Sequence, residues 1–341
     1  MLYSHSFVLF GMAQPTVFGR SSFGDMAVFV FFVISGYLVC ESWERDSNPL
    51  RFGLRRALRI MPGLFVAVLF TTLVIGTAAT SFALSDYVSS NLTWAYVLSN
   101  ISLVCGIDRL PGVFESNPFP HAVNGSLWSL RYEVLMYAFL VLLGWVAPKH
   151  RLTGACCAIF LLFATCWCLG RAMGLDHYSL PIPGLWRLGL ELDSMRLANL
   201  GALFFAGSLL YLWRVRIPMS PLAALALLAV VAASAGNDWF NPLLWLALPY
   251  SVIVAARRLP APFQLFGATD YSYGIYIYAF PVQQFFSQIA IRNGWTWSVT
   301  LAVEGAATVA LAASSWHFVE RPALAWKKVI RARQVAQTVE R

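Results

Sequence analysis

The chain is short of charge. Only 12% of its 341 residues are Asp, Glu, Lys or Arg, whereas a soluble domain carries about 25%. Hydrophobic residues make up 59% instead, and the mean hydropathy is +0.65. This balance excludes a soluble globular protein. The apolar runs are long and uninterrupted, without the alternation typical of outer-membrane barrels. We therefore predict an all-α integral membrane protein, because helices satisfy their own backbone hydrogen bonds in lipid.

Acidic residues are especially scarce, with 16 against 24 Lys and Arg, so the formal net charge is +8. This excess does not indicate a nucleic-acid partner, because the basic residues cluster in short stretches between apolar runs. Such clusters are what the positive-inside rule describes. We expect the basic loops and the basic C-terminus to face the cytoplasm, and we expect membrane lipid around the spans.

Recognisable soluble-enzyme motifs are also missing. The sequence has no G-x-S-x-G elbow, Walker loop or dinucleotide fingerprint, and no internal repeat, low-complexity tract or soluble second domain. The six cysteines lie mostly inside apolar runs, so we interpret them as small buried hydrophobes. No metal-ligand spacing relates the five histidines, and no metal is expected. The histidines are His5, His121, His150, His177 and His317.

About ten spanning helices are predicted, since a span takes about 20 residues. Their segments are 1–18, 25–40, 60–82, 127–147, 154–171, 197–213, 220–236, 240–256, 272–292 and 297–317. Residues 92–104 must then be interfacial or re-entrant, so that the basic connector Arg45–Arg59 stays on the cytoplasmic side. The first segment is barely long enough to cross and has no signal-peptide features. It looks like the second half of a helix whose beginning is missing.

The stretch Asn124–Glu133 runs directly into the apolar segment Val134–Val146. An ionisable residue inside a membrane is costly unless it is paired or used, so Glu133 is a candidate site residue. Helical spacing predicts one face formed by Ser129, Tyr132, Glu133 and Tyr137. Trp128 and Arg131 fall on a different stripe. The alternative is an interfacial aromatic belt with a snorkelling arginine.

Three more groups carry polar chemistry. Ser35 and Gly36 are small residues that let a ligand or another backbone come close. Arg56 and Arg59 are three apart and share a helix face, although they could serve only as an orientation signal. His5 lies in the first apolar segment, where a structural role is the alternative. A histidine base, an orienting carboxylate and arginines that hold phosphates are the parts needed to move an acyl group from a phosphate-bearing carrier to a hydroxyl.

Two polar regions lie elsewhere. Arg171–Arg196 is expected to be an outside loop that either covers an acceptor or is a solvated connector, and Pro181 and Pro183 break any long helix in it. Asp270 opens the tyrosine-rich helix near 272–292, where the helix dipole favours an acidic residue.

Five motifs are spread over nearly the whole chain. They are Phe31-Phe-Val-Ile-Ser-Gly-Tyr37, Arg55-Arg-Ala-Leu-Arg-Ile-Met-Pro62, Gly125-Ser-Leu-Trp-Ser-Leu-Arg-Tyr-Glu133, Tyr271-Ser-Tyr-Gly-Ile-Tyr-Ile-Tyr278 and Phe318-Val-Glu-Arg-Pro322. In these motifs and in their order the sequence resembles the acyltransferase-3 family of polytopic bacterial inner-membrane O-acyltransferases, which modify surface and envelope sugars. The resemblance implies a ten-helix membrane acyltransferase domain, here residues 1–322, followed by a basic cytoplasmic tail, 323–341.

The resemblance also implies roles for individual residues. His5 matches the family's catalytic histidine, which would take the hydroxyl proton or first accept the acetyl group. Glu133 matches the glutamate after the tryptophan-serine-leucine signature. Arg56 and Arg59 match the arginine pair thought to meet the acyl donor, and Ser35 matches the serine-glycine signature of the donor region. The implied donor is acetyl-coenzyme A, and the implied acceptor is a hydroxyl of a sugar in a cell-surface or lipid-linked glycan.

Two departures from the family pattern stand out. The family has an arginine about eleven positions before its histidine, whereas only four residues precede His5. Ala279 stands where many members have a histidine, so this position is not expected to be catalytic. The alternatives to an O-acyltransferase are a carrier or flippase for a lipid-linked sugar and a non-catalytic relative. Carriers often show inverted repeats, which this sequence lacks. The sequence does not indicate an oligomeric state.

Overall fold

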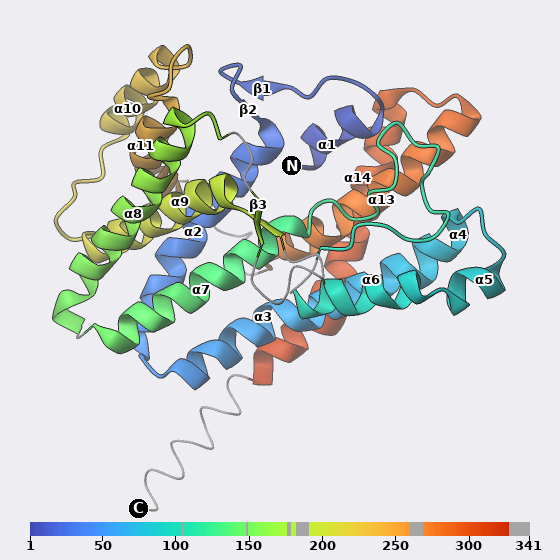
Figure 1. Ribbon diagram of the computed structural model, residues 1–341, viewed down its shortest axis with the longest axis horizontal. Coiled ribbons are helices and arrows are strands. Elements are labelled where there is room, and N and C mark those ends of the chain that lie inside the picture. Colours follow the sequence, from blue (N-terminus) through green and yellow to red (C-terminus); the bar gives the residue numbers. More distant parts are fainter. Residues whose placement is uncertain (104–105, 148, 176–178, 182–190, 259–268, 327–341) are drawn as a thin grey trace, which may run out of the picture. The chain divides into compact units, whose positions relative to one another are not determined.

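A computed structural model describes the chain except for residues 104–105, 148, 176–178, 182–190, 259–268 and 327–341 (Figure 1). The described residues are 76% helical and contain almost no sheet. Within the described residues, seven helices are long and apolar enough to cross a membrane. They cover Phe23–Arg45, Pro49–Ala79, Trp128–Val146, Leu152–Ala172, Ser194–Leu212, Phe240–Arg258 and Trp297–Trp326. The protein is thus a multi-pass membrane protein, as predicted.

The predicted count of ten spans is not confirmed. Helix α1 (Leu2–Leu9) has 8 residues and α10 (Pro221–Ala233) has 13, too few for a hydrocarbon core about 30 Å thick. Helix α13 (Ser272–Asn293) has 22 residues but is not among the seven. Helix α6 (Asn91–Ser102), in the region 92–104 that was predicted to be interfacial or re-entrant, has 12 residues and is also not among the seven.

The connector predicted at Arg45–Arg59 is much shorter in the structure, and this prediction was wrong. Helix α2 (Phe23–Arg45) ends at Arg45, and α3 (Pro49–Phe70) begins four residues later. Proline is well suited to the first turn of a helix because its missing N–H would have no intrahelical partner there. The arginines from Arg51 to Arg59 therefore lie on the first turns of α3. Charge alone does not end a helix that extends beyond the hydrocarbon.

The described chain forms two compact units. Unit 1 consists of Met1, Pro15–Pro49 and Trp128–Leu265, and unit 2 of Leu2–Gln14, Leu50–Leu127 and Phe266–Arg341. Unit 1 also contains β1 (Thr16–Val17), β2 (Ser21–Ser22), α7 (Trp128–Val146), η2 (Lys149–Arg151), α8 (Leu152–Ala172), β3 (Ser179–Pro181), β4 (Glu191–Asp193), α9 (Ser194–Leu212) and α11 (Phe240–Arg258). Strands β1 and β2 pair antiparallel, as do β3 and β4.

In unit 1, α9 packs along α2 and α8 (Figure 1). The approach of α2 and α9 is close because both carry small residues at the crossing. A Cβ added at Gly36 would overlap the backbone carbonyl of Phe204, and one at Gly207 would overlap that of Val33. The Ser208 hydroxyl donates a hydrogen bond to the Gly36 carbonyl over 3.0 Å. Small residues let helices in lipid come this close, so Gly36 serves backbone packing.

Unit 2 is organised around α13, which packs against α1 and α14 (Trp297–Ser315). Besides α3 and α6, it contains η1 (Thr71–Gly76), α4 (Thr77–Ala79), α5 (Leu84–Ser89) and η5 (Trp316–Glu320). Both η1 and η5 are π-helical, and they continue α3 and α14 respectively. The Tyr87 hydroxyl donates to the Thr72 carbonyl inside η1 over 2.8 Å. In η5, Phe318 is 81% exposed whereas Glu320 is buried.

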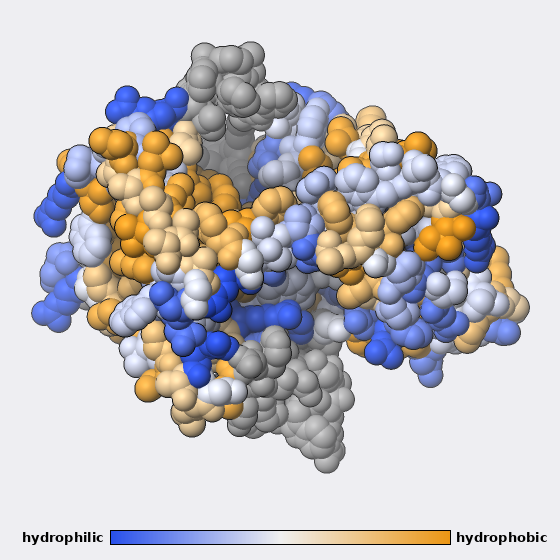
Figure 2. Space-filling model, turned by 90° about the horizontal axis from the view of Figure 1, so that it is seen from above, coloured by the Kyte–Doolittle hydropathy of each residue, from blue (hydrophilic) through white to orange (hydrophobic). Residues whose placement is uncertain are grey.

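The outer surface carries large apolar side chains (Figure 2). Helix α10 exposes Leu222 and Leu225, and the end of α7 exposes Trp145 and Val146. Soluble monomers rarely expose contiguous apolar surface of this kind, which marks membrane or protein contact. These side chains fit a lipid-facing surface.

Candidate active site

In unit 1, a buried polar cluster forms where α2 meets α7. The Ser35 hydroxyl donates to Oε1 of Glu133 over 3.1 Å and lies 3.4 Å from the Tyr137 hydroxyl. The Tyr137 hydroxyl donates to the same carboxylate oxygen. Glu133 is only 4% exposed, so its carboxylate is removed from solvent and held by hydroxyl donors. Such an arrangement can orient a base or bind a hydroxyl of a substrate.

The helical face predicted for α7 is confirmed. Ser129, Tyr132, Glu133 and Tyr137 are all buried, whereas Trp128 and Arg131 are only partly buried. The Asp193 backbone N–H donates to the Tyr132 hydroxyl over 3.0 Å. The Asp193 side chain in turn caps the first turn of α9. Tyr132 therefore connects the turn that carries Glu133 to the start of α9.

In unit 2, α1 and its His5 are held by side chains of α13. Gln283 Nε2 donates to the Leu2 carbonyl over 3.0 Å, and the Ser287 hydroxyl donates to the Leu9 carbonyl over 2.5 Å. The two donors are one turn apart on α13 and contact both ends of the short helix. The edge of the His5 ring meets the Phe280 ring, with 5.2 Å between centroids. The position of His5 is thus determined largely by α13.

Phe280 is also a contact for the segment that precedes α7. A Cβ on Gly125 would lie 2.8 Å from the Phe280 ring, which explains why this position needs glycine. The Asn124 side-chain amide donates to the Ile277 carbonyl over 2.9 Å, and the Tyr276 hydroxyl donates to the Ser126 carbonyl. The first residues of the asparagine-glycine-serine motif therefore dock on the tyrosine-rich α13.

Arg59 is held by two carboxylates of unit 2. Its guanidinium forms an ion pair with Asp270, and its Nη1 lies 3.4 Å from Oε2 of Glu320. Its Cζ lies 5.5 Å from the centroid of the Tyr273 ring. Glu320 also accepts a 2.9 Å hydrogen bond from the Ser315 hydroxyl. Arg59 therefore links the middle of α3 to the segment just before α13 and to η5, in addition to any contact with a donor.

The two arginines of the predicted pair have different surroundings. The guanidinium carbon of Arg56 lies 5.8 Å from the centroid of the Phe52 ring, one turn earlier on α3. Both side chains are partly exposed. The prediction that they meet the acyl donor stays a prediction.

The structure thus describes two sets of predicted site residues. Ser35 and Glu133 belong to unit 1 and are hydrogen-bonded, whereas His5, Arg56 and Arg59 belong to unit 2. Within unit 2, Arg59 and His5 both contact side chains of α13. Tyr273 contacts Arg59 and Phe280 contacts His5, and the two aromatic residues are about 10 Å apart along the helix axis.

Sequence reasoning missed Glu304 on α14. Its Oε1 accepts a 2.7 Å hydrogen bond from Gln283 Nε2, the same amide that holds α1. Glu304 is 2% exposed, and Thr300 and Thr308 lie buried one turn before and after it. The signal that could have found it is the one used for Glu133, a carboxylate within an apolar span.

Metal ligation has no support in the described part of the chain. No group of three or more His, Cys, Asp or Glu side chains there could hold a metal ion. The predicted loop residues Asp176, His177, Pro183 and Arg187 lie outside the described residues, as does most of the predicted tail.

Comparisons with known proteins give a consistent result. The family model of acyltransferase-3, described as an acyltransferase domain, matches residues 1–317. An "O-acetyl transferase" of Shigella phage Sf6 is 31% identical, covering 94% of this chain and 91% of the relative. "Nodulation protein 10" of Rhizobium leguminosarum bv. viciae is 26% identical, covering 92% of this chain and 86% of the relative.

A third relative is longer. "Peptidoglycan O-acetyltransferase OatA" of Listeria monocytogenes is 26% identical over 88% of this chain but only 51% of the relative. No solved structure matches the chain.

Proposed function

Because the chain belongs to the acyltransferase-3 family and is an O-acyltransferase, we propose that it transfers an acetyl group from acetyl-coenzyme A to a hydroxyl of a sugar in a cell-surface or lipid-linked glycan. The observation that carries the proposal is the match over nearly its full length to a relative named as an O-acetyl transferase. The relative from Listeria monocytogenes is named as a peptidoglycan O-acetyltransferase, which favours a glycan acceptor.

His5 is the proposed base. It takes the proton of the sugar hydroxyl while that oxygen bonds to the acetyl carbonyl carbon. The carbon–sulfur bond of the thioester then breaks, and the departing coenzyme A thiolate takes up the proton. Phe280 supports this role because its contact with the His5 ring limits the orientation of the imidazole.

Glu133 is proposed to orient the acceptor or the base. Its carboxylate is fixed by Ser35 and Tyr137, so it costs little reorganisation when a further hydroxyl binds. Arg56 is the proposed contact for the donor phosphates, because a guanidinium binds phosphate through parallel hydrogen bonds. Arg59 is proposed to support Arg56 from the next turn, while its own charge is compensated by Asp270 and Glu320. Ser35 is still proposed to belong to the region that binds the acyl donor.

The proposed location is the bacterial inner membrane, with the basic helix ends in the cytoplasm. Four helices of unit 1 carry such ends, at Arg45, Arg151, Arg214 and Arg258. In this proposed orientation α3 begins on the cytoplasmic side, where coenzyme A is made, because it follows the Arg45 end of α2 directly.

The test is acetyl transfer from radiolabelled acetyl-coenzyme A by the purified chain in proteoliposomes with envelope glycan. His5→Ala should abolish transfer while membrane expression stays intact. His150→Ala is the matched control, since this exposed histidine lies outside the proposed machinery. Full transfer by His5→Ala would refute its role. Movement of lipid-linked sugar without acetylation would refute the transferase and favour a carrier.

A further inference from the structure

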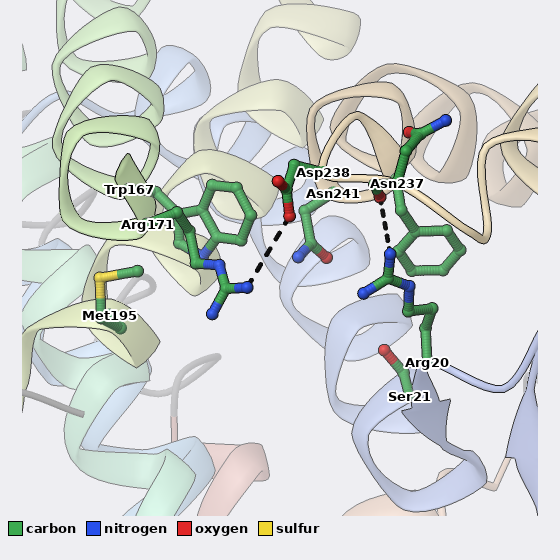
Figure 3. A pocket seen from close by; sticks show the side chains of 9 residues that line it. Arg20, Ser21, Trp167, Arg171, Met195, Asn237, Asp238 and Asn241 are labelled. Atoms are coloured by element: carbon green, nitrogen blue, oxygen red, sulfur yellow. Dashed lines mark hydrogen bonds and ion pairs between the residues drawn. The ribbon is translucent and has the colours of Figure 1, made fainter. Parts of the chain in front are cut away.

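A polar cavity in unit 1 has no part in the chemistry described above. Its volume is about 230 Å³. It is lined by Arg20, Ser21, Trp167, Arg171, Met195, Asn237, Asp238, Phe240 and Asn241 (Figure 3). These residues come from the segments where α2, α9 and α11 begin and α8 ends. We propose that this cavity binds one sugar unit of the acceptor glycan. The identification of that sugar as part of the acceptor rests on the proposed function.

The cavity lies at one common end of four helices. Their other ends carry basic residues: Arg45 on α2, Arg151 before α8, Arg214 and Arg216 after α9, and Arg257 and Arg258 on α11. Because basic residues favour the cytoplasmic side, the cavity opens on the opposite, extracytoplasmic side. The acceptor sugar would then enter the cavity from that side.

The walls of the cavity are fixed before any ligand binds. Arg20 donates from Nε to the Ala235 carbonyl and from Nη2 to the Asn237 carbonyl, the latter over 2.9 Å. Both bonds anchor the turn between α10 and α11. Arg171 lies 3.8 Å from the Asp238 carboxylate (Figure 3). A preorganised wall reduces the entropy lost on binding.

The lining distinguishes a sugar from an anion. Asp238 offers only acceptors when ionised, Asn241 offers both donors and acceptors, and the arginines offer only donors. Sugar hydroxyls both donate and accept, so a mixed lining suits them. A fully ionised phosphate offers only acceptors, so it would leave the acceptor oxygens of Asp238 without donors. Trp167 adds an apolar surface, and its ring packs edge-on against Trp245 at 5.3 Å.

The size and position of the cavity also fit a sugar subsite. Drug-sized ligands occupy about 300–1,000 Å³, so this smaller space suits a single ring. Met195, which lines the cavity, lies two residues after Asp193, whose N–H binds Tyr132 next to Glu133. The cavity and the buried Glu133 cluster are thus joined through one turn of unit 1.

The test is direct binding of radiolabelled methyl glycosides to the full chain in nanodiscs, by equilibrium dialysis. The probes are a hexose, a 6-deoxyhexose and an N-acetylhexosamine, with inorganic pyrophosphate as competitor. We expect at least one glycoside to bind with a millimolar Kd and pyrophosphate not to compete. The double variant Asp238→Ala/Asn241→Ala should raise that Kd about tenfold, the effect of losing one or two hydrogen bonds. Asn293→Ala is the control, since this exposed amide donates to its own helix, at the Ile289 carbonyl, far from the cavity lining in sequence.

Three results would overturn the sugar site: no glycoside binds, the double variant binds as tightly as the parent, or pyrophosphate displaces the glycoside. The last would show an anion site. A parallel assay measures hydrolysis of acetyl-coenzyme A without acceptor, which the double variant should leave within twofold. If the parent protein hydrolyses and transfers nothing, the proposed function fails, while the glycoside measurement still decides the cavity.

Discussion

Replacement of Gln283 by leucine tests the polar contact that holds α1. The change removes the donor to the Leu2 carbonyl and the donor to the buried Glu304 carboxylate. A buried acceptor that loses its partner costs about 1–3 kcal/mol, whereas hydrogen bonds between helices in lipid average about 0.6 kcal/mol. Glu304 is 2% exposed and has little access to water, so we expect about 2 kcal/mol of destabilisation.

A second replacement isolates the part due to Glu304. In Gln283→Leu/Glu304→Leu the carboxylate is gone, while the loss at the Leu2 carbonyl is common to both variants and cancels in the comparison. The double variant should therefore be more stable than Gln283→Leu by about 1–2 kcal/mol, as expected for directly coupled neighbours. Glu304→Gln should be nearly neutral, because its amide oxygen still accepts from Gln283.

The assay is unfolding by added SDS in mixed micelles, followed by circular dichroism. The reasoning is refuted if the double variant is as unstable as Gln283→Leu, or less stable. Acetyl transfer supplies an independent readout. Both leucine variants should lose activity together, since each releases the helix that carries His5, whereas Glu304→Gln should stay within about threefold of the parent.

Three further predictions concern the packing around the candidate site. Gly36→Ala would force the helix crossing apart against the Phe204 carbonyl, so expression of folded protein in detergent should fall sharply, whereas Gly53→Ala, in open space, should not matter. Tyr137→Phe removes one donor to Glu133 and should lower kcat about tenfold with unchanged expression; wild-type kcat would contradict a role for this cluster. Arg59→Lys cannot bridge its two carboxylate partners and should lower thermal stability, whereas replacement of the exposed Arg292 by Lys should not.

Much of the architecture could be predicted from local patterns. Composition alone indicates helices in lipid, and spacing by three and four correctly places Tyr132 and Glu133 on the buried side of α7. The partners of these residues were out of reach, because Ser35 is 98 positions from Glu133. Contacts over such separations depend on how helices pack, which local periodicity does not encode.

The extent of α3, the partners of Arg59 and the number of spans could not be predicted from the sequence, for related reasons. Arg51–Arg59 was assigned to a connector because of its charge, but these residues can extend a helix beyond the hydrocarbon. Spacing predicts that Arg59 shares a face with Arg56, but its carboxylate partners lie 211 and 261 residues further along the chain, where local spacing gives no information. The count of about ten spans is not confirmed, because the described residues contain seven candidate spans and the predicted segments at α1 and α10 form helices of only 8 and 13 residues.

The π-helical turn η5 also sets the direction in which α14 presents its last carboxylate. Glu304 and Glu320 are 16 residues apart, so an uninterrupted α-helix would point them about 160° away from each other. Both are buried nevertheless. A π turn accommodates one extra residue, which takes back about 100° of rotation and leaves them about 60° apart. Deleting the exposed Phe318 would leave 15 residues of regular α-helix between the two carboxylates, which again gives about 60°. The extra residue and the π turn therefore compensate each other, and the deletion should leave Glu320 facing Arg59.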